Sequence, residues 1–201
     1  MARACALALG LALAVLRPDV GRAADAIVCS PGTEPREAAR AGGRDAWCER
    51  TGTNPKVREG PFVSWHVNGA VSIRGQYRDG KPSGDWKSWH ATAAQSGEVT
   101  FVDGKPTGML LGWYPNGQAS FVGGFRDGTP IGAMELFDPD GRMRGAADFG
   151  PDGTERSRRA WDDANRAIDP GSPAAQETSA RALQSTPLIY MALTAASAPA
   201  R

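Results

Sequence analysis

The sequence predicts an all-β protein, a single twisted antiparallel meander sheet built from about four 24-residue β-hairpin units, with a C-terminal helix and a flexible tail. Three features predict it. A glycine-containing turn, an aromatic residue five positions after it and a second aromatic series all return every 24 residues between positions 60 and 153. A constant period of this length is typical of repeat proteins, whose units bury their apolar faces against each other. We therefore expect residues 60–153 to form one repeat domain.

The turns between successive units begin with Asp-Gly and end on a second glycine. Glycine is favoured there because it reaches positive φ, and aspartate because it hydrogen-bonds to nearby backbone. The repeat-turn glycines are Gly80, Gly84, Gly104, Gly108, Gly128 and Gly132. We interpret Asp79, Asp103 and Asp127, which open these turns, as turn residues rather than as catalytic carboxylates.

Within each unit, a second turn separates two short strands. Asn68-Gly69 and Asn116-Gly117 have the residue types of a two-residue hairpin turn with positive φ. The second unit has Thr92-Ala93 at this place, which predicts a longer or irregular loop there. Short strands, glycine-rich turns and many aromatic residues together favour antiparallel β structure.

Aromatic residues mark the strands and supply the candidate binding residues. The first aromatic series, Trp65, Trp89, Trp113 and Phe137, could form the buried face of the sheet. It could instead be an exposed strip that stacks against a sugar polymer or a partner strand. The alternation of side chains along a strand places Trp86 and Trp89 on opposite faces. The second series is Tyr77, Phe101, Phe125 and Phe149. The ladder and binding candidates are Trp65, Trp86, Trp89, Trp113, Tyr114 and Phe137.

Residues 1–26 have the pattern of a secretory signal peptide. Arg3 is followed by an apolar stretch, residues 5–16, and by the small-x-small site Ala24-Asp25-Ala26. An uncleaved N-terminal anchor is the alternative, although the apolar run is short for a membrane span. Removing the three arginines and two aspartates of this segment from the 23 basic and 22 acidic residues leaves a neutral chain. Neutrality and the lack of a basic run argue against nucleic acid as a partner, and cleavage would leave no integral membrane segment.

Residues 27–59 are rich in Pro, Gly and Arg and are expected to form a small, loop-rich N-terminal cap. After signal cleavage Cys29 and Cys48 would be the remaining cysteines. An even pair in an exported chain favours a disulfide, and the absence of a Cys-x-x-Cys motif argues against a redox site. We therefore expect the cap to be pinned by a Cys29–Cys48 bridge.

Two segments follow the repeats. Trp161, Ala164 and Ile168 lie on one face of a helix, so residues 154–171 are predicted to form a capping helix that covers the sheet edge. Residues 172–201 form a low-complexity tail rich in Ala, Ser and Pro. Within it, Ser172-Pro173 has the residue types of a helix start, for a helix reaching about Gln184.

No pattern in the sequence predicts catalysis, a cofactor or a metal site. His66 and His90 are one period apart, which is too far for a shared metal, and we expect them at a tolerant, solvent-side strand position. Asp138-Pro139-Asp140-Gly141 is too short for a Ca²⁺ loop and is interpreted as a turn. Nucleophile-elbow, phosphate-loop and dinucleotide motifs are absent from the sequence.

The repeat unit resembles a known family. Its best copy, with Trp65, Asn68-Gly69, Tyr77, Asp79-Gly80-Lys81, Gly84, Trp86 and Trp89, is similar to the variant MORN repeat of YwqK-like, antitoxin-type proteins, here in an exported bacterial form. The resemblance covers residues 60–153. It implies a β-hairpin array that serves as a binding or scaffolding surface, and it implies no catalytic residues.

These observations predict a non-enzymatic, secreted or periplasmic repeat protein that binds or scaffolds a protein partner in the cell envelope. A cell-wall or glycan-binding module with an exposed aromatic strip is the alternative. Catalytic, cofactor and metal residues are predicted to be absent.

Overall fold

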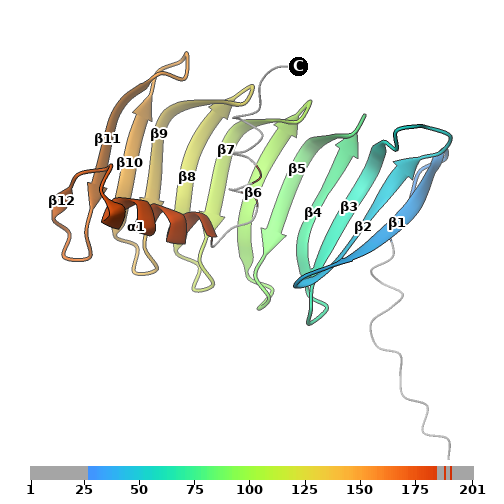
Figure 1. Cartoon of the computed structure of the whole chain (residues 1–201), viewed down its shortest axis with the longest axis horizontal. Helices are drawn as coiled ribbons and strands as arrows, with labels where there is room; N and C mark the ends of the chain where they lie inside the picture. The colour runs from blue at the N-terminus through green and yellow to red at the C-terminus, as the bar shows by residue number, and fades with distance from the viewer. Residues whose placement is uncertain (1–26, 185–187, 189–190, 192–201) are drawn as a thin grey trace, which may run out of the picture.

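The computed structural model describes residues 27–184, 188 and 191. The predicted signal peptide, residues 1–26, and residues 192–201 of the predicted tail lie outside this part of the chain. In the described part, one antiparallel meander sheet holds twelve strands in chain order, and one helix lies near its C-terminal end (Figure 1). The predicted fold class is confirmed. The elements are β1 (Thr33–Arg40), β2 (Gly43–Arg50), β3 (Arg58–His66), β4 (Val71–Arg78), β5 (Lys81–Trp89), β6 (Gln95–Val102), β7 (Lys105–Trp113), β8 (Ala119–Arg126), β9 (Thr129–Phe137), β10 (Met143–Phe149), β11 (Glu155–Trp161), β12 (Ala167–Ile168) and α1 (Pro173–Gln184).

The sheet has one more hairpin at each end than the four predicted units. Residues 27–59, expected to be loop-rich, contain the hairpin of β1 and β2, and β2 pairs with β3 along the sheet. The predicted capping helix at 154–171 is also wrong, because this segment forms β11 and β12. The helical spacing of Trp161, Ala164 and Ile168 was misleading. Trp161 lies 24 residues after Phe137 and continues the strand ladder, while Ala164 is in a turn.

Backbone hydrogen bonds repeat at both ends of the hairpins. At the Asp-Gly end, the N–H of Gly104 donates to the carbonyl of Pro82 at 3.0 Å, and that of Gly128 donates to Pro106 at 2.9 Å. At each hairpin tip, a backbone N–H donates to the carbonyl four residues later, as the His66 N–H does to the Ala70 carbonyl at 2.8 Å. Each turn is therefore tied to the preceding unit.

The second hairpin tip is regular, contrary to expectation. His90 N–H donates to the Ala94 carbonyl at 2.8 Å, the same closure as in the other units. Ala93 occupies the glycine position with φ of 65°, and Asn165 occupies it in the last hairpin with φ of 59°. The loop geometry is thus imposed by the neighbouring strands, even where the residue disfavours positive φ.

Large side chains on one sheet face are accommodated by small ones on the next strand. Trp86 is fully buried, and a Cβ added at Gly75 would lie 2.1 Å from its ring. Trp86 packs on Phe62 and against the edge of Phe101, with ring centroids 5.5 and 6.1 Å apart. The core of this face also includes Val99, Leu110, Phe121, Phe125 and Leu188.

Helix α1 covers this same face. It begins at Pro173 after the N-cap Ser172, whose hydroxyl accepts from the N–H of Ala175 at 3.3 Å, and it ends at Gln184 as expected. Figure 1 shows the helix lying across β8 to β11. Leu188, fully buried, extends the apolar cover. We call this side the covered face.

The N-terminal segment packs on the opposite side. Cys29 and Cys48 form the predicted disulfide, with Cα atoms 5.7 Å apart. Ile27 packs against the buried cluster of Ala46, Val63 and Trp65. The two ends of the sheet are therefore covered on opposite faces. We call the side that bears Trp65 the open face, because beyond the N-terminal strands the described residues leave it without a second layer.

Candidate interaction surface

The six aromatic candidates separate into buried and accessible groups. Trp65 and Trp86 are each 1% exposed and Tyr114 is 7% exposed, which leaves them no surface for a partner. Trp86 fills the core of the covered face, and the guanidinium of Arg44 stacks over Trp65 at 3.7 Å from the ring centroid. These three residues hold the sheet together.

The accessible aromatic residues lie in a row on the open face. Trp89, Trp113 and Phe137 end successive odd-numbered strands and are half-buried. The odd spacing from Trp86 places Trp89 on the opposite face, as the alternation predicts. Trp161 is the next member of the row, where Arg159 stacks on it at 5.8 Å. Sequence reasoning missed Trp161 as a ladder residue, although its 24-residue distance from Phe137 was the available signal.

An apolar patch adjoins this row at the middle of the sheet. Met109, Leu111 and Trp113 are alternate residues of β7 and share the open face, and Leu111 pairs with Val122 of β8. Met109 is 52% exposed. We call Met109, Leu111, Trp113, Val122 and Phe137 the open-face patch.

Charged side chains border the open-face patch. On one side the Lys87 ammonium lies 4.0 Å from the Glu98 carboxylate. On the other, Glu135 pairs with Val122 across β8 and β9. An apolar centre with a polar, solvent-accessible border is typical of protein-binding surfaces.

A hollow next to the patch combines an aromatic wall with polar groups. Its volume is about 360 Å³. Its lining comes from β3, β4 and β5, and comprises Pro61, Arg74, Gly75, Gln76, Asp85, Lys87 and Trp89. This combination can stack against the ring of a sugar and hydrogen-bond to its hydroxyls.

The two histidines have a structural role rather than the expected solvent-side position. The Nε2–H of His66 donates to the carbonyl of Trp89 at 2.9 Å, and that of His90 donates to Trp113 at 2.8 Å. The Tyr114 hydroxyl donates to Phe137 at 2.7 Å. One position per unit thus ties each hairpin tip to the aromatic row of the next unit.

In the fourth unit an ion pair replaces this contact. Arg144, 5% exposed, donates to the Asp138 carboxylate, with Nε at 2.8 Å, and to the backbone carbonyl of Asp162. Burial raises the pKa of Asp138, but hydrogen bonds from the Arg142 N–H and the Arg144 guanidinium outweigh it and hold the pKa below its ordinary value. The charged pair therefore bridges the last two hairpins.

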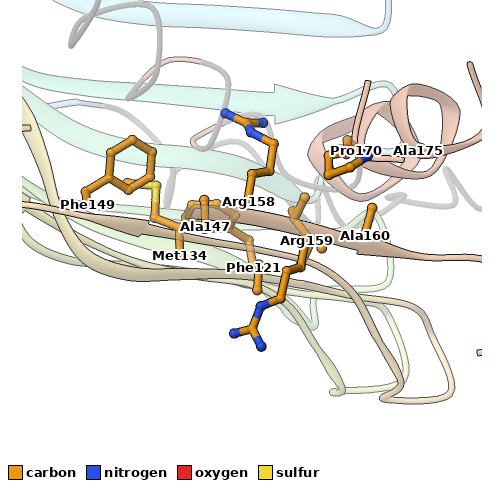
Figure 2. A pocket seen from close by; sticks show the side chains of 13 residues that line it. Phe121, Met134, Ala147, Phe149, Arg158, Arg159, Ala160, Pro170 and Ala175 are labelled. Carbon is orange, nitrogen blue, oxygen red and sulfur yellow. The ribbon is translucent and has the colours of Figure 1, made fainter. Parts of the chain in front are cut away.

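A cavity of about 270 Å³ lies between the covered face and α1 (Figure 2). Most of its lining residues are small or apolar, such as Ala147 and Ala160 from the sheet and Ala175 from the helix, and Arg158, Arg159 and Ser179 add polar groups. Arg158 points to the helix side of the sheet and Arg159 to the other side. A hydrogen bond from Arg158 lowers the pKa of Glu155 and raises that of Arg158.

Among the described residues, no cluster of three or more His, Cys, Asp or Glu side chains could hold a metal ion. Within the same part of the chain, no helix has the length and apolar character needed to cross a membrane.

No protein-family model matches the chain, and no curated protein shows significant similarity to it.

Proposed function

We propose that the chain is an exported, non-enzymatic repeat protein that binds a protein partner in the cell envelope through the open-face patch. The observation that carries the proposal is the half-exposed Met109, which shares the uncovered face of β7 with Leu111 and Trp113. Exposed apolar patches with charged borders mark interaction sites on soluble proteins.

Export and repeat identity belong to the same proposal. The Cys29–Cys48 bridge supports export, because disulfides persist in oxidising compartments. The hairpin units with one period and one set of ladder contacts support the MORN-like assignment. The signal peptide that would direct export lies outside the described residues.

The test is a crosslinking pull-down from native envelope with the chain from Ile27 as bait. Met109→Lys and Trp113→Ala are expected to lose the partner that the unmodified bait enriches. Val67→Lys is the matched control, since Val67 is 83% exposed at a hairpin tip outside the patch. A partner retained equally by all three variants would refute the open-face site.

Glycan binding is the second candidate function, and the spacing of the aromatic row favours it. Successive aromatics lie two strand spacings apart, which gives a rise of roughly 9.6 Å per unit, close to the disaccharide repeat of an extended β-1,4-linked glycan. The hollow beside Trp89 supplies polar groups for sugar hydroxyls. Co-sedimentation with insoluble peptidoglycan that is lost in Trp89→Ala would establish this function, and an unretained chain would reject it.

A further inference from the structure

The last full strand of the sheet, β11, has a partly open edge. Strand β12 pairs only with Ala160 and Trp161. In the described part of the chain, residues 155–159 have no strand beside them on that side. Backbone groups alternate in direction along a strand, so Arg158 directs its N–H and C=O outward as Ala160 does. These groups are available to a further strand.

The two edges of the sheet differ in how they are protected. Strand β1, the opposite edge, contains Pro35, which has no N–H to offer, and alternates acidic with basic side chains. The open part of β11 has no proline and has arginine at positions 156, 158 and 159. Charged side chains keep such an edge from pairing with a copy of itself, but without a proline its backbone can still accept a strand of complementary charge.

The charge of the β11 edge selects the partner. Two of the three guanidinium groups have carboxylate partners: Arg158 pairs with Glu155, and Arg156 lies 4.0 Å from Asp148 and also interacts with Asp152. Arg159 stacks on Trp161, and no described carboxylate pairs with it. The Arg159 guanidinium can therefore attract an acidic side chain on the same face of an added strand, which favours an acidic strand.

The cavity beneath α1 adjoins this edge. Arg158 and Ala160 of β11 line it, together with Phe149 of β10 and Ala175 of α1 (Figure 2). A residue paired opposite Arg158 on an added strand would point to the same face as Arg158, because paired residues share a face. That face is the covered one, so this side chain would enter the apolar cavity.

We propose that the β11 edge and the cavity beneath α1 form one peptide-binding site, which takes an extended acidic segment of a partner protein as an additional strand. Main-chain hydrogen bonds to Arg158, attraction to the arginines and one apolar side chain in the cavity provide recognition. This site is separate from the open-face patch and does not depend on it.

The test measures fluorescence polarisation of labelled seven-residue peptides bound to the chain from Ile27. A peptide that alternates glutamate with leucine is expected to bind at least about tenfold more tightly than one that alternates lysine with leucine. The same acidic peptide with N-methyl groups on alternate residues, prepared in both registers, is expected to lose binding in one register, because methylation removes the ladder hydrogen bonds. High salt should weaken binding of the unmethylated peptide.

Three variants separate the components of the site. Arg158→Gln removes the charge and keeps the backbone N–H, whereas Arg158→Pro removes both while leaving the bonds to β10 in place. Binding should fall in the first and fall further in the second. Ala147→Leu occupies the cavity and should weaken the leucine peptide more than a matched alanine peptide. Trp113→Ala, on the open face, should leave all peptide affinities unchanged.

Equal affinity for acidic and basic peptides, or tolerance of methylation in both registers, would overturn the proposal, whatever the variants do. Loss of peptide binding in Trp113→Ala, with Arg158→Gln unaffected, would place the peptide on the open-face patch instead. Neither result would bear on the envelope pull-down, which tests that patch separately.

Discussion

Gly75 is required by the size of Trp86. The ring of this tryptophan occupies the space that a Cβ at position 75 would need, because that Cβ would lie 2.1 Å from the ring atom Cδ2. We expect Gly75→Ala to lower the free energy of unfolding by about 1–3 kcal/mol, as overpacking of a core does, measured by urea denaturation. Gly171→Ala is the control, because its added Cβ would approach no atom closer than 3.5 Å. Similar losses in both variants would contradict this account.

Ala93 is the residue least suited to its backbone conformation. With φ of 65° it occupies the glycine position of its hairpin tip. Ala93→Gly should therefore raise the free energy of unfolding by about 1 kcal/mol, seen as a higher thermal midpoint. Gly117→Ala at the equivalent position, where φ is 83°, should lower stability by a similar amount. Shifts of the same sign in the two variants would disprove the argument.

Asp138 makes stability depend on acid pH. The pKa of Asp138 is lower in the folded chain than in the unfolded chain. Its contribution to the free energy of unfolding is therefore fully present above the unfolded pKa, roughly 3.9. This contribution is lost as the pH falls through the folded pKa. At neutral pH, Asp138→Asn should cost about 3 kcal/mol, because it leaves the buried Arg144 without its carboxylate. Urea titrations at neutral and acidic pH should show the cost shrinking in acid, and a pH-independent difference would contradict this prediction.

At the scale of elements, the disulfide holds the N-terminal segment onto the open face. It closes a loop with a sequence separation of 19 residues. By lowering the conformational entropy of the unfolded chain, a crosslink of this length stabilises the folded state by roughly 3 kcal/mol. We expect Cys29→Ser/Cys48→Ser, or reduction of the native chain, to lower the thermal midpoint. Because Ile27 covers Trp65, tryptophan fluorescence should also shift to longer wavelength. A midpoint insensitive to reductant would contradict the structural role.

The sequence predicted elements where residue type and period agree. The Asp-Gly turns and the strands between them have both signals, and Ser172-Pro173 specifies the start of α1 by capping chemistry alone. The last hairpin was mispredicted because Asn165 replaces the glycine of its tip and the strand residues Arg156 to Arg159 are not apolar. Pairing with β10 decides its structure, and pairing is a tertiary effect that local periodicity does not contain.

The candidate site was harder to predict than the fold. All aromatic candidates share the same period, so spacing alone could not separate Trp65, buried under Arg44 and Ile27, from Trp89 and Trp113 on the same face. Their exposure depends on segments distant in sequence that pack over one end of the sheet. The cavity beneath α1 likewise arises between residues far apart in the chain.

At the scale of the whole molecule, stability should be highest in the centre of the sheet. Along the sheet each hairpin pairs only with its neighbours, so the terminal hairpins are paired on one side only. Hydrogen exchange is expected to be slowest in β5 to β8 and fastest in β11 and β12, where the last strand has two residues. Uniform protection across all twelve strands would instead indicate a single cooperative unit.

The opposite placement of the two end covers has a consequence for how such a chain can change length. Neither the disulfide-held segment nor α1 reaches across to the other, so the central hairpins are interchangeable in principle. Gain or loss of one whole 24-residue unit would preserve the pairing register of the remaining hairpins and alter the span of the open face by roughly 9.6 Å. A change by an odd number of residues within a strand would invert the faces. The number of repeat units therefore sets the length of the open face.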